Sequence, residues 1–511
     1  MRLEIHTRVA EALPTLRRRL SAYRSSDAPP SPAGASRGPR AKERERGTDV
    51  ALTVRRRLVF SAVVGAGIGG SAAAHFLRQH FGPDVQLDVY EKGEVGGRLA
   101  TVTVNRNRYE SGGSIIHALN LHMHDFVKRL GLKQRRGVAG KTAVFDGASV
   151  VAEETDWYLL DLLRLWWRYG SSFIRLQMWL EDIMEKFIRI YKYQAHGYAF
   201  SSLEELLESL GGSGFVNMTR RPLSDSLLEL GVSQRFIDEV VAPVIRLNYG
   251  QNVSVPAFVG AVSLASAQSN MWAVEGGNKL LCEGLLELAN ANLLRARVTS
   301  VRTLRSGEAL QYELTLAGEG PERRTAAYDA VVVAAPLRAG AGISFPDWAS
   351  PSVPGEGEWQ GAGVTLVHGY LNTSLFGFRD ARLFPYAGVL TTAAPALFFN
   401  SVAGVYPVEV PPGFRRKRAH EAAVYKVFSP AALTGEQLKT LFRSYYSAQA
   451  TEWRAYPRYG SRPARIEWAG SAMEMSAVAA KNIALLAYRR WNGRSLQVNR
   501  EDLLRAIKTE L

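Results

Sequence analysis

Three glycines in the segment Gly65-Ala66-Gly67-Ile68-Gly69-Gly70 have the spacing GxGxxG, which is typical of a turn that binds the phosphates of a dinucleotide. Gly65 permits the tight turn, Gly67 lets a pyrophosphate approach the backbone, and Gly70 lets a helix pack on a strand. The free N–H groups at the start of that helix bind the anion. The predicted phosphate-binding residues are Gly65, Gly67, Gly69 and Gly70.

The elements on either side of this turn are the ones that such a site requires. Residues 58–64 form a short apolar run suited to a buried parallel strand, and residues 71–77 have a good helix pattern. A second strand over 85–90 leads to Glu91, 21 residues after Gly70, where an acid binds ribose hydroxyls. A lone GxGxxG is often only a structural turn, but strand, helix and acid together favour dinucleotide binding.

A second pair of glycines distinguishes between the dinucleotides. Gly96-Gly97-Arg98 follows Glu91 closely, and Gly112-Gly113-Ser114 follows a short strand pattern. Glycines let backbone approach a flat ring and arginine neutralises phosphate charge, whereas NAD-dependent dehydrogenases have no need of these elements. Both segments are similar to those of flavoproteins of the amine-oxidase and carotenoid-desaturase group, which favours FAD. A hairpin turn is the alternative interpretation of the first glycine pair.

This similarity implies a place for each segment on the cofactor. The first glycine pair and its arginine would lie along the pyrophosphate and ribityl chain, and the second Gly-rich turn would face the flavin. A strand over 297–301 would meet the adenine through its backbone. The residues that the similarity adds to the cofactor site are Gly96, Gly97, Arg98, Gly112, Gly113, Ser114 and Val298.

The order of these segments predicts an α/β fold. It is a Rossmann-type FAD-binding domain, amine-oxidase-like and discontinuous, interleaved with an α+β substrate domain. The predicted organisation is a disordered basic leader at 1–58, FAD-binding segments at 59–150 and 269–338, a helical substrate-domain segment at 151–268, a second substrate-domain segment at 339–463, and a C-terminal return to the FAD-binding domain with a helix at 464–511.

Composition and charge exclude several classes of protein. Hydrophobic residues make up 46% and charged residues 22% of the 511 residues, which excludes a disordered, collagen-like or disulfide-stapled chain. The net charge is +15, but residues 1–58 supply +8 of it with 14 Lys/Arg against 6 Asp/Glu. We therefore expect no nucleic-acid partner. No apolar run of about 18 residues predicts a membrane span, and the single Cys282 excludes an internal disulfide.

Residues 63–100, 155–200, 242–285 and 471–477 carry a more specific resemblance. They are similar to the prenylcysteine oxidases, and the chain is identified as a member of that family from about Leu58 to Leu511. The resemblance implies an FAD-dependent thioether oxidase, lysosomal or secreted. It would convert S-prenyl-L-cysteine (farnesyl or geranylgeranyl) and O2 to cysteine, a prenyl aldehyde and hydrogen peroxide. The alternative is a flavin-oxidase-like protein of the same fold that is catalytically weak or acts on another apolar substrate.

A prenyl chain requires an apolar cavity, and residues 157–193 are rich in apolar side chains at helical spacing. We expect this segment to line or cover the substrate site. Ordinary core helices are one alternative, and a surface that associates with lipid or lipoprotein is another. The tryptophans predicted to meet the substrate are Trp157, Trp166, Trp167 and Trp179.

Other residues carry weaker expectations. The triplets at Asn217, Asn252 and Asn372 are N-glycosylation acceptors that suit a secretory route, although no signal peptide is visible in residues 1–58. His117 follows the second Gly-rich turn and is a candidate for a place near the flavin. His122 and His124 are two residues apart and would point apart on a helix, so no metal site is expected.

The chain departs from the family between Pro463 and Ile466. Members of the family have roughly a dozen more residues here, carrying a strand of the C-terminal return to the flavin domain. Losing that strand would remove a buried neighbour of the flavin site. The hypothesis that follows is that this chain folds poorly or binds FAD weakly.

Overall fold

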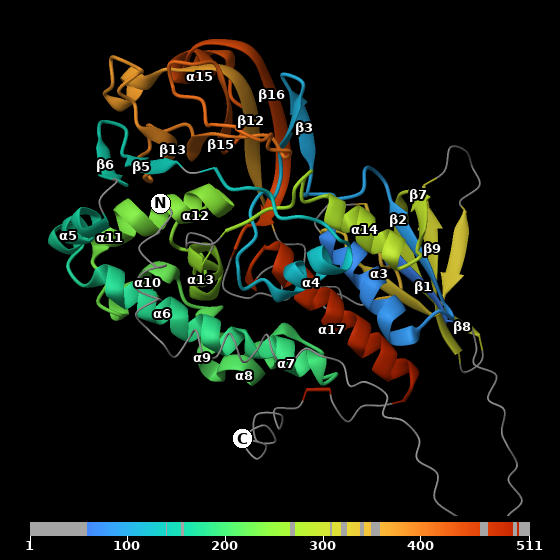
Figure 1. Ribbon diagram of the computed structural model, residues 1–511. Helices are drawn as coiled ribbons and strands as arrows, with labels where there is room; N and C mark the ends of the chain where they lie inside the picture. The colour runs from blue at the N-terminus through green and yellow to red at the C-terminus, as the bar shows by residue number, and fades with distance from the viewer. Residues whose placement is uncertain are drawn as a thin grey trace, which may run out of the picture.

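A computed structural model describes residues 59–138, 140–154, 158–265, 271–306, 309–317, 324–337, 342–348, 358–459, 469–493 and 498–499 (Figure 1). Three predictions lie outside these residues. They are the disorder of the leader at 1–58, the place of Trp157, and the shortened segment around 463–466.

The predicted dinucleotide-binding domain is built on a parallel sheet. Its four strands have the order β11 (Ala330–Val333), β1 (Val59–Val64), β2 (Val85–Glu91) and β7 (Asn292–Arg295). Both neighbours of β1 are parallel to it, and all of its residues except Phe60 are buried, as the short apolar run predicted. The strands come from three separated parts of the chain, which confirms the predicted discontinuous α/β fold.

Helices cover one face of this sheet and a small sheet covers the other (Figure 1). Helix α3 (Ile68–Phe81) follows β1 and packs against α14 (Leu280–Leu288) and α17 (Met473–Trp491). Small side chains of α17 reach this interface, and they include Ala477, Ala480 and Ala484. The small sheet is antiparallel, with the order β10 (Thr325–Tyr328), β9 (Ala309–Leu316) and β8 (Val298–Ser306).

A seven-stranded sheet forms the second unit of the fold. Its strands have the order β16 (Phe442–Pro457), β12 (Trp359–Leu371), β15 (Ala423–Ser429), β14 (Ser401–Gly404), β13 (Tyr386–Thr391), β5 (Lys141–Phe145) and β6 (Val150–Glu153). Strands β5 and β13 are parallel, and the other neighbours are antiparallel. Residues 141–150 therefore belong to this sheet and not to the first FAD-binding segment, so the predicted boundary at 150 was wrong. An apolar run predicts a strand but does not reveal which sheet it joins.

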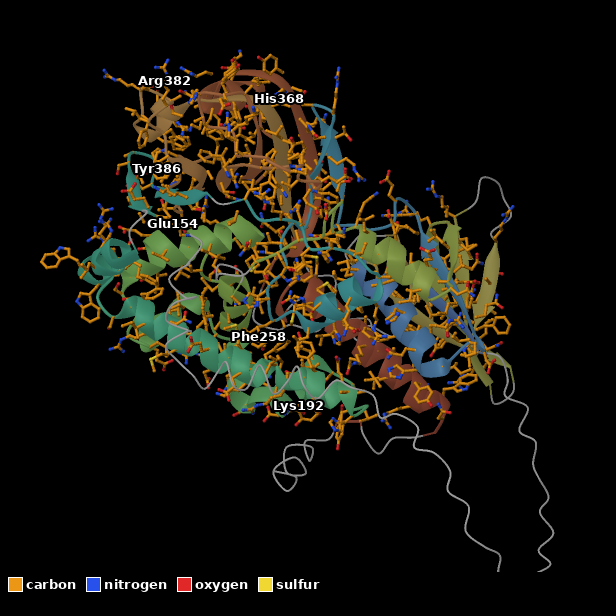
Figure 2. The ribbon with its side chains drawn as sticks, in the orientation of Figure 1. Glu154, Lys192, Phe258, His368, Arg382 and Tyr386 are labelled. Carbon is orange, nitrogen blue, oxygen red and sulfur yellow. The ribbon has the colours of Figure 1, made fainter. Side chains whose placement is uncertain are left out.

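A layer of helices lies against this sheet (Figure 1). It contains α5 (Tyr158–Tyr169), α6 (Ser172–Phe187), α7 (Arg189–Ala195), α8 (Leu203–Gly211), α9 (Ser213–Met218), α10 (Leu223–Glu229), α11 (Gln234–Phe236), the π-helical turn η1 (Ile237–Val241), α12 (Ala242–Tyr249) and α13 (Ala257–Ala265). Helix α13 is apolar on nearly every side because it lies in the middle of this layer, where Phe258 is buried (Figure 2). Within the described residues, no helix combines the length and hydropathy that a membrane span requires.

Four further elements complete the described chain. The hairpin of β3 (Thr101–Val104) and β4 (Asn107–Glu110) and helix α4 (Leu121–Arg129) lie between the two units. The 3-10 turn η2 (Thr373–Phe376) and helix α15 (Gly435–Leu441) belong to the loops of the large sheet. Strand β4 leads directly into the second Gly-rich turn and β3 follows the Gly96-Gly97-Arg98 segment, so the hairpin joins the two.

Candidate active site

The first Gly-rich turn has the geometry that its sequence predicts. Gly65 has a φ of +105°, a conformation that only glycine adopts readily, and its N–H donates to the carbonyl of Tyr90 at 2.8 Å. A Cβ atom on Gly70 would lie 1.8 Å from the carbonyl oxygen of Gly65, so only glycine lets α3 begin this close to β1. A Cβ atom on Gly69 would make an ordinary contact of 3.7 Å with Ser476.

The N-terminus of α3 is open to an anion. Its N-cap residue, Gly67, provides no side-chain hydrogen bond, and the first turn contains no acidic residue. The backbone of Gly96 runs alongside Gly67, and its N–H donates to the carbonyl of Ala66 at 2.9 Å. A Cβ atom on Gly97 would lie 3.6 Å from the Cα atom of Gly67. Unpaired helical N–H groups facing a backbone without side chains fit a pyrophosphate.

Glu91 lies at the end of β2, where the motif predicts a ribose-binding acid. Its Oε2 accepts a hydrogen bond from the N–H of Ala66 at 2.8 Å, and its Oε1 accepts one from the N–H of Gly93 at 2.8 Å. These bonds fix the carboxylate beside the first turn. Each carboxylate oxygen retains a further lone pair, so the group can still accept ribose hydroxyls.

Val298 lies near the same end of β2. It is the first residue of β8, it is buried, and it belongs to a cluster with Tyr90 of the parallel sheet. Two residues earlier, the N–H of Ala296 donates to the carbonyl of Glu91 at 3.1 Å. The structure therefore brings Val298 to the edge predicted for the adenosine half of the dinucleotide, and its contact with adenine stays a prediction.

The second Gly-rich turn is tied to the Gly96-Gly97-Arg98 segment through Arg98. The N–H of Gly113 donates to the carbonyl of Arg98 at 3.0 Å, and a Cβ atom on Gly112 would lie 1.9 Å from that carbonyl oxygen. The Arg98 guanidinium donates to the carbonyl of Ala455 at 2.6 Å and to the hydroxyl of Ser471 at 3.3 Å. Arg98 thus joins the turn to β16 and to the start of α17. Its predicted contact with the pyrophosphate stays a prediction.

A buried lysine that was not predicted from the sequence binds the second Gly-rich turn. Lys426 of β15 is 4% exposed, and its Nζ donates to the carbonyl of Gly112 at 3.0 Å and to the hydroxyl of Ser114 at 3.4 Å. Burial lowers the pKa of Lys426 to about 8, although the charge of Glu110 raises it. A lone lysine in the apolar strand 423–429 was the available signal, because lysine is seldom buried without a role.

Glu110 and Asn278 form the other side of this turn. Oε1 of Glu110 accepts from the N–H of Asn278 at 2.8 Å, and the Asn278 side chain donates to the carbonyl of Gly113 at 3.0 Å. Oε2 of Glu110 is buried, and no hydrogen bond to it is found among the described residues. Burial raises the pKa of Glu110. The turn predicted to face the flavin is therefore held between a buried acid and a buried cation.

The three histidines His117, His122 and His124 contact different partners. His122 and His124 are both on α4. The Nε2 of His122 lies 2.9 Å from Oε1 of Gln194, whereas the ring of His124 lies against Trp272. His117 lies between the second Gly-rich turn and α4, where its Nδ1 accepts from a backbone N–H. No group of three or more potential metal ligands occurs in the part of the chain that is described.

The structure does not bring all of the predicted tryptophans together. Trp179 is half-buried and packs against the helical core. Trp166 and Trp167 of α5 are 57% and 92% exposed and face away from that core. The geometry therefore leaves Trp179 as the described tryptophan that can meet a substrate inside the helical layer. Sequence spacing placed all of them on helices but could not tell an inner face from an outer one.

Glu474 makes the free energy of unfolding depend on pH. It lies in the first turn of α17, is 5% exposed, and accepts hydrogen bonds from the N–H of His122 at 2.8 Å and the hydroxyl of Tyr191 at 2.7 Å. Burial nevertheless raises its pKa from 4.5 to about 7. The folded state then binds the proton more tightly than the unfolded state. Protonated Glu474 therefore stabilises the folded state fully below pH 4.5. This stabilisation is lost as pH rises towards 7, which lowers the free energy of unfolding by on the order of 3 kcal/mol.

We expect Glu474→Gln to unfold with a flatter dependence on pH than the unchanged protein between pH 5 and 7.5. Thermal unfolding at a series of pH values measures the difference. Burial lowers the pKa of His75, His80 and His122 to about 4, so these groups destabilise the fold as pH falls below 6.5, and they are present in both proteins. Identical slopes in the two proteins would show that Glu474 does not titrate in this range.

Comparison with known proteins agrees with this architecture. The prenylcysteine lyase family matches residues 152–500, and a NAD(P)-binding Rossmann-like domain matches residues 63–130. The chain is 56% identical to prenylcysteine oxidase 1-like of Homo sapiens over 469 residues, which cover 88% of this chain and 94% of the relative. It is 45% identical to prenylcysteine oxidase 1 of Bos taurus over 470 residues, which cover 88% and 92%.

Solved structures share the fold at low sequence identity. Cyclohexylamine oxidase from Brevibacterium oxydans aligns with a TM-score of 0.53 at 14% identity, over 85% of this chain and 100% of its own. Putrescine oxidase bound to putrescine aligns with a TM-score of 0.53 at 15% identity, over 85% and 99%. The family match over residues 152–500 and the high identity to both kinds of prenylcysteine oxidase show that the chain belongs to the prenylcysteine lyase family.

Proposed function

We propose that this protein is an FAD-dependent oxidase that cleaves the thioether of S-prenyl-L-cysteine, with farnesyl or geranylgeranyl as the prenyl group. The observation that carries the proposal is a pair of Gly-rich turns, one at the start of α3 and open to a pyrophosphate, the other beside the buried Glu110 and Lys426. Relatives named prenylcysteine oxidase, at 43–56% identity, support the choice of substrate.

FAD fits the two turns for reasons of shape and charge. Gly67 and Gly96 leave room for the phosphates, and Glu91 can accept from the ribose. Gly112 and Gly113 let the second turn lie close to the Gly96-Gly97-Arg98 segment, because a Cβ atom would strike the carbonyl oxygen of Arg98 or the side chain of Leu99. When bound, FAD would accept the two electrons of the oxidation and pass them to O2 as hydrogen peroxide.

The protein's part in the reaction is to bind, orient and desolvate. One C–S bond breaks, the prenyl C1 becomes an aldehyde with oxygen from water, and the sulfur leaves as the cysteine thiol. No strong base is needed for this sequence of events. Lys426 and Glu110 would hold the turn against the cofactor, and the helical layer around Trp179 would accept the prenyl chain.

Peroxide release tests the substrate. Purified protein with added FAD should release peroxide with S-farnesyl-L-cysteine and not with cyclohexylamine or putrescine. These two amines are the compounds named for solved oxidases that share this fold. Peroxide from the amines alone would overturn the thioether specificity. A heat-denatured sample supplies the background rate.

A secretory or lysosomal location accompanies this proposal. It is supported by the exposed positions of Asn217 on α9 and Asn252 before α13. Asn372 is half-buried, and its side chain donates to the carbonyl of Thr440 at 3.0 Å, so it should carry less glycan. Mass loss on treatment with an N-glycosidase, from protein made in animal cells, tests this; an unchanged mass would contradict it.

A chain of the same fold with weak FAD binding is the second candidate. Among the described residues, β11 pairs with β1 alone and forms the edge of the parallel sheet. The alignment with the human relative is 469 residues long but covers only 88% of the 511 residues of this chain. Some residues of the relative therefore have no counterpart in this chain. Both observations are expected if this chain lacks the strand that its relatives have after Pro463. Purified protein that holds one FAD per chain would rule this candidate out.

A further inference from the structure

We propose that the outer end of the helical layer docks the protein on an anionic lipid bilayer. The docking surface, named the α5–α6 tip, consists of Leu163, Trp166 and Trp167 of α5 and Ile174 and Met178 of α6. The inference rests on the proposed function for the lipidic nature of the substrate. Binding to lipid, however, can be measured without turnover.

The tip exposes an unusual amount of apolar surface in one place. Trp167 is 92% exposed, Met178 66%, Leu163 64%, Trp166 57% and Ile174 47%. Single exposed apolar side chains are ordinary on a protein surface, but a cluster from one helical hairpin marks an interaction site. In Figure 1 the label α5 stands at the outer edge of the molecule, far from the parallel sheet.

The geometry of α5 explains why its tryptophans face outward. Leu163, Trp166 and Trp167 have i, i+3 and i+4 spacing and therefore share one face of the helix. The opposite face carries Arg168 and Tyr169, and Tyr169 is only 5% exposed. Helix α5 thus packs one face against the protein and, among the described residues, leaves the apolar face of Leu163, Trp166 and Trp167 exposed.

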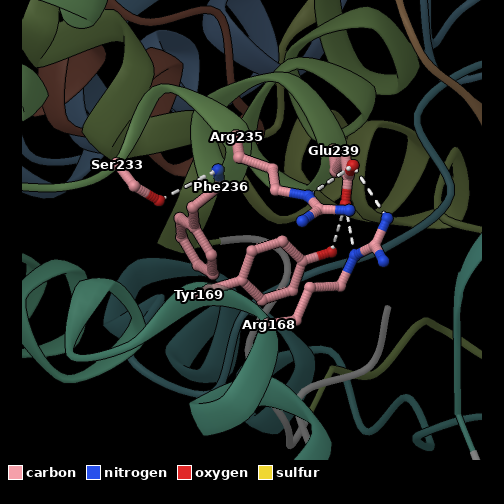
Figure 3. Close-up of polar contacts among 6 residues, drawn as sticks. All are labelled: Arg168, Tyr169, Ser233, Arg235, Phe236 and Glu239. Carbon is pink, nitrogen blue, oxygen red and sulfur yellow. Dashed lines mark hydrogen bonds and ion pairs between the residues drawn. The ribbon is translucent and has the colours of Figure 1, made fainter.

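A polar clamp fixes this orientation (Figure 3). The Arg168 guanidinium donates to both oxygens of Glu239 at 2.7 and 2.9 Å, and the hydroxyl of Tyr169 donates to Oε2 at 2.8 Å. Arg235 donates to the same carboxylate at 3.2 Å. Glu239 lies in the π-helical turn η1, and the ring of Tyr169 meets Phe236 edge-on at 5.2 Å. Turning Trp166 or Trp167 inward would break this bidentate pair.

The charges around the tip fit an anionic surface. Residues 163–178 contain three arginines and no acidic residue. Arg168 is neutralised by Glu239, and Arg164 lies 3.3 Å from Glu153 while remaining 60% exposed. Arg175 is exposed, and its guanidinium donates to a hydroxyl and a carbonyl. Arg164 and Arg175 can therefore reach lipid phosphates, with their stems lying along the apolar surface.

This combination favours lipid over a protein partner. Tryptophan prefers the headgroup level of a bilayer, where its ring is apolar and its N–H is wet. A stable protein interface buries about 800 Å² per partner around a shaped pocket, whereas the tip is a projecting end of two helices. A helix with an apolar face flanked by arginines is typical of interfacial binding. Docking here would present the helical layer to prenyl chains held in the bilayer.

Flotation of the full chain with lipid vesicles tests the docking. The vesicles contain phosphatidylcholine and phosphatidylserine in equal parts, or phosphatidylcholine alone. Trp166→Ala with Trp167→Ala should lower the fraction bound to the mixed vesicles roughly tenfold or more. Arg164→Gln with Arg175→Gln should weaken binding to the mixed vesicles and leave binding to phosphatidylcholine unchanged.

Matched variants away from the tip serve as controls. Trp491→Ala removes an exposed tryptophan at the end of α17, and Arg305→Gln removes an exposed arginine of β8. Both should bind vesicles like the unchanged protein. The basic residues 1–58 are present in every variant, so their attraction to anionic lipid cancels from the comparison. Equal thermal unfolding midpoints would show that the tip variants are folded.

Three results separate the possibilities. Unchanged vesicle binding by the folded double tryptophan variant would overturn the docking surface. A self-association of the unchanged protein that this variant loses, with no vesicle binding by either, would also overturn it and assign the tip to a contact between copies. Tip-dependent binding without any oxidation of S-farnesyl-L-cysteine would uphold the docking and sink the proposed function on which it draws.

Discussion

Replacing Gly70 with alanine should abolish the retention of FAD, and the purified variant should be colourless. A Cβ atom at this position would lie 1.8 Å from the carbonyl oxygen and 3.0 Å from the carbonyl carbon of Gly65. Both atoms are backbone, so α3 would have to move away from β1. The phosphates would then lose the N–H groups at the start of that helix. Overpacking of this kind costs about 1–3 kcal/mol or more, which corresponds to a loss of affinity of about fivefold to more than about a hundredfold.

Gly69→Ala is the matched control because it adds the same methyl group one residue earlier. Its Cβ atom would meet only Ser476, at 3.7 Å. The predicted role of Gly69 belongs to its backbone N–H, which alanine keeps, so this variant should retain FAD and its visible absorbance. Thermal unfolding of both variants without FAD separates lost binding from lost folding. Full FAD content in Gly70→Ala would contradict the tight turn on which the cofactor site depends.

Replacing Lys426 with methionine should have the second largest effect, on stability and on turnover together. The substitution keeps the length of the side chain but removes the hydrogen bonds to Gly112 and Ser114. It also removes one of the two cations, Arg135 and Lys426, whose charges act on the buried Glu110. Leaving the partly buried carbonyl of Gly112 without its donor costs about 1–3 kcal/mol. We expect lower thermal stability and a fall in kcat/KM with S-farnesyl-L-cysteine, because the turn against the cofactor loses its support.

The pairing with Glu110 is testable by a double-mutant cycle. Glu110→Gln with Lys426→Met should be less destabilised than the sum of the two single variants, by about 1–3 kcal/mol. If the two effects add, Lys426 and Glu110 are independent and the account of this turn is wrong. If one single variant fails to fold, the stability of the double variant still shows whether removing both groups is tolerated better than removing one.

The pH dependence of Lys426 gives an independent signature. Burial lowers its pKa to about 8, below the ordinary 10.5, so the folded state disfavours the charged form. The destabilising effect is greatest below pH 8 and disappears as pH rises towards 10.5. The unchanged protein should therefore gain stability over this range relative to Lys426→Met. A catalytic inflection near pH 8 that is absent from the variant would link the same group to turnover.

The first turn could be predicted from sequence because its constraints are local. Gly65, Gly67 and Gly70 act within six residues of one another, and the strand, helix and acid around them follow within the same short segment. Sequence spacing is sufficient for such a site because the chain has no freedom to place these residues elsewhere. The turn at Gly96 and the hairpin before Gly112 could also be predicted, because their constraints are local in sequence as well.

The rest of the site depends on contacts between distant segments. Lys426 lies 314 residues from Gly112, and no local pattern connects them. Glu110 lies two residues before Gly112, but its role depends on burial against β15 and Asn278, which are distant in sequence. The outward direction of Trp167 depends on a clamp to Glu239, more than 70 residues away from it. Residues 141–150 were assigned to the FAD-binding segment although β5 pairs with β13, because strand pairing is also decided at long range.

Flavin reduction without oxygen tests the central claim most directly. The full chain is loaded with FAD, made anaerobic and mixed with S-farnesyl-L-cysteine while the visible absorbance of the oxidised cofactor is recorded. The account predicts that the absorbance bleaches, and that admitting air restores it with release of hydrogen peroxide and a prenyl aldehyde. Absorbance that stays unchanged in protein holding FAD would contradict a prenylcysteine oxidase.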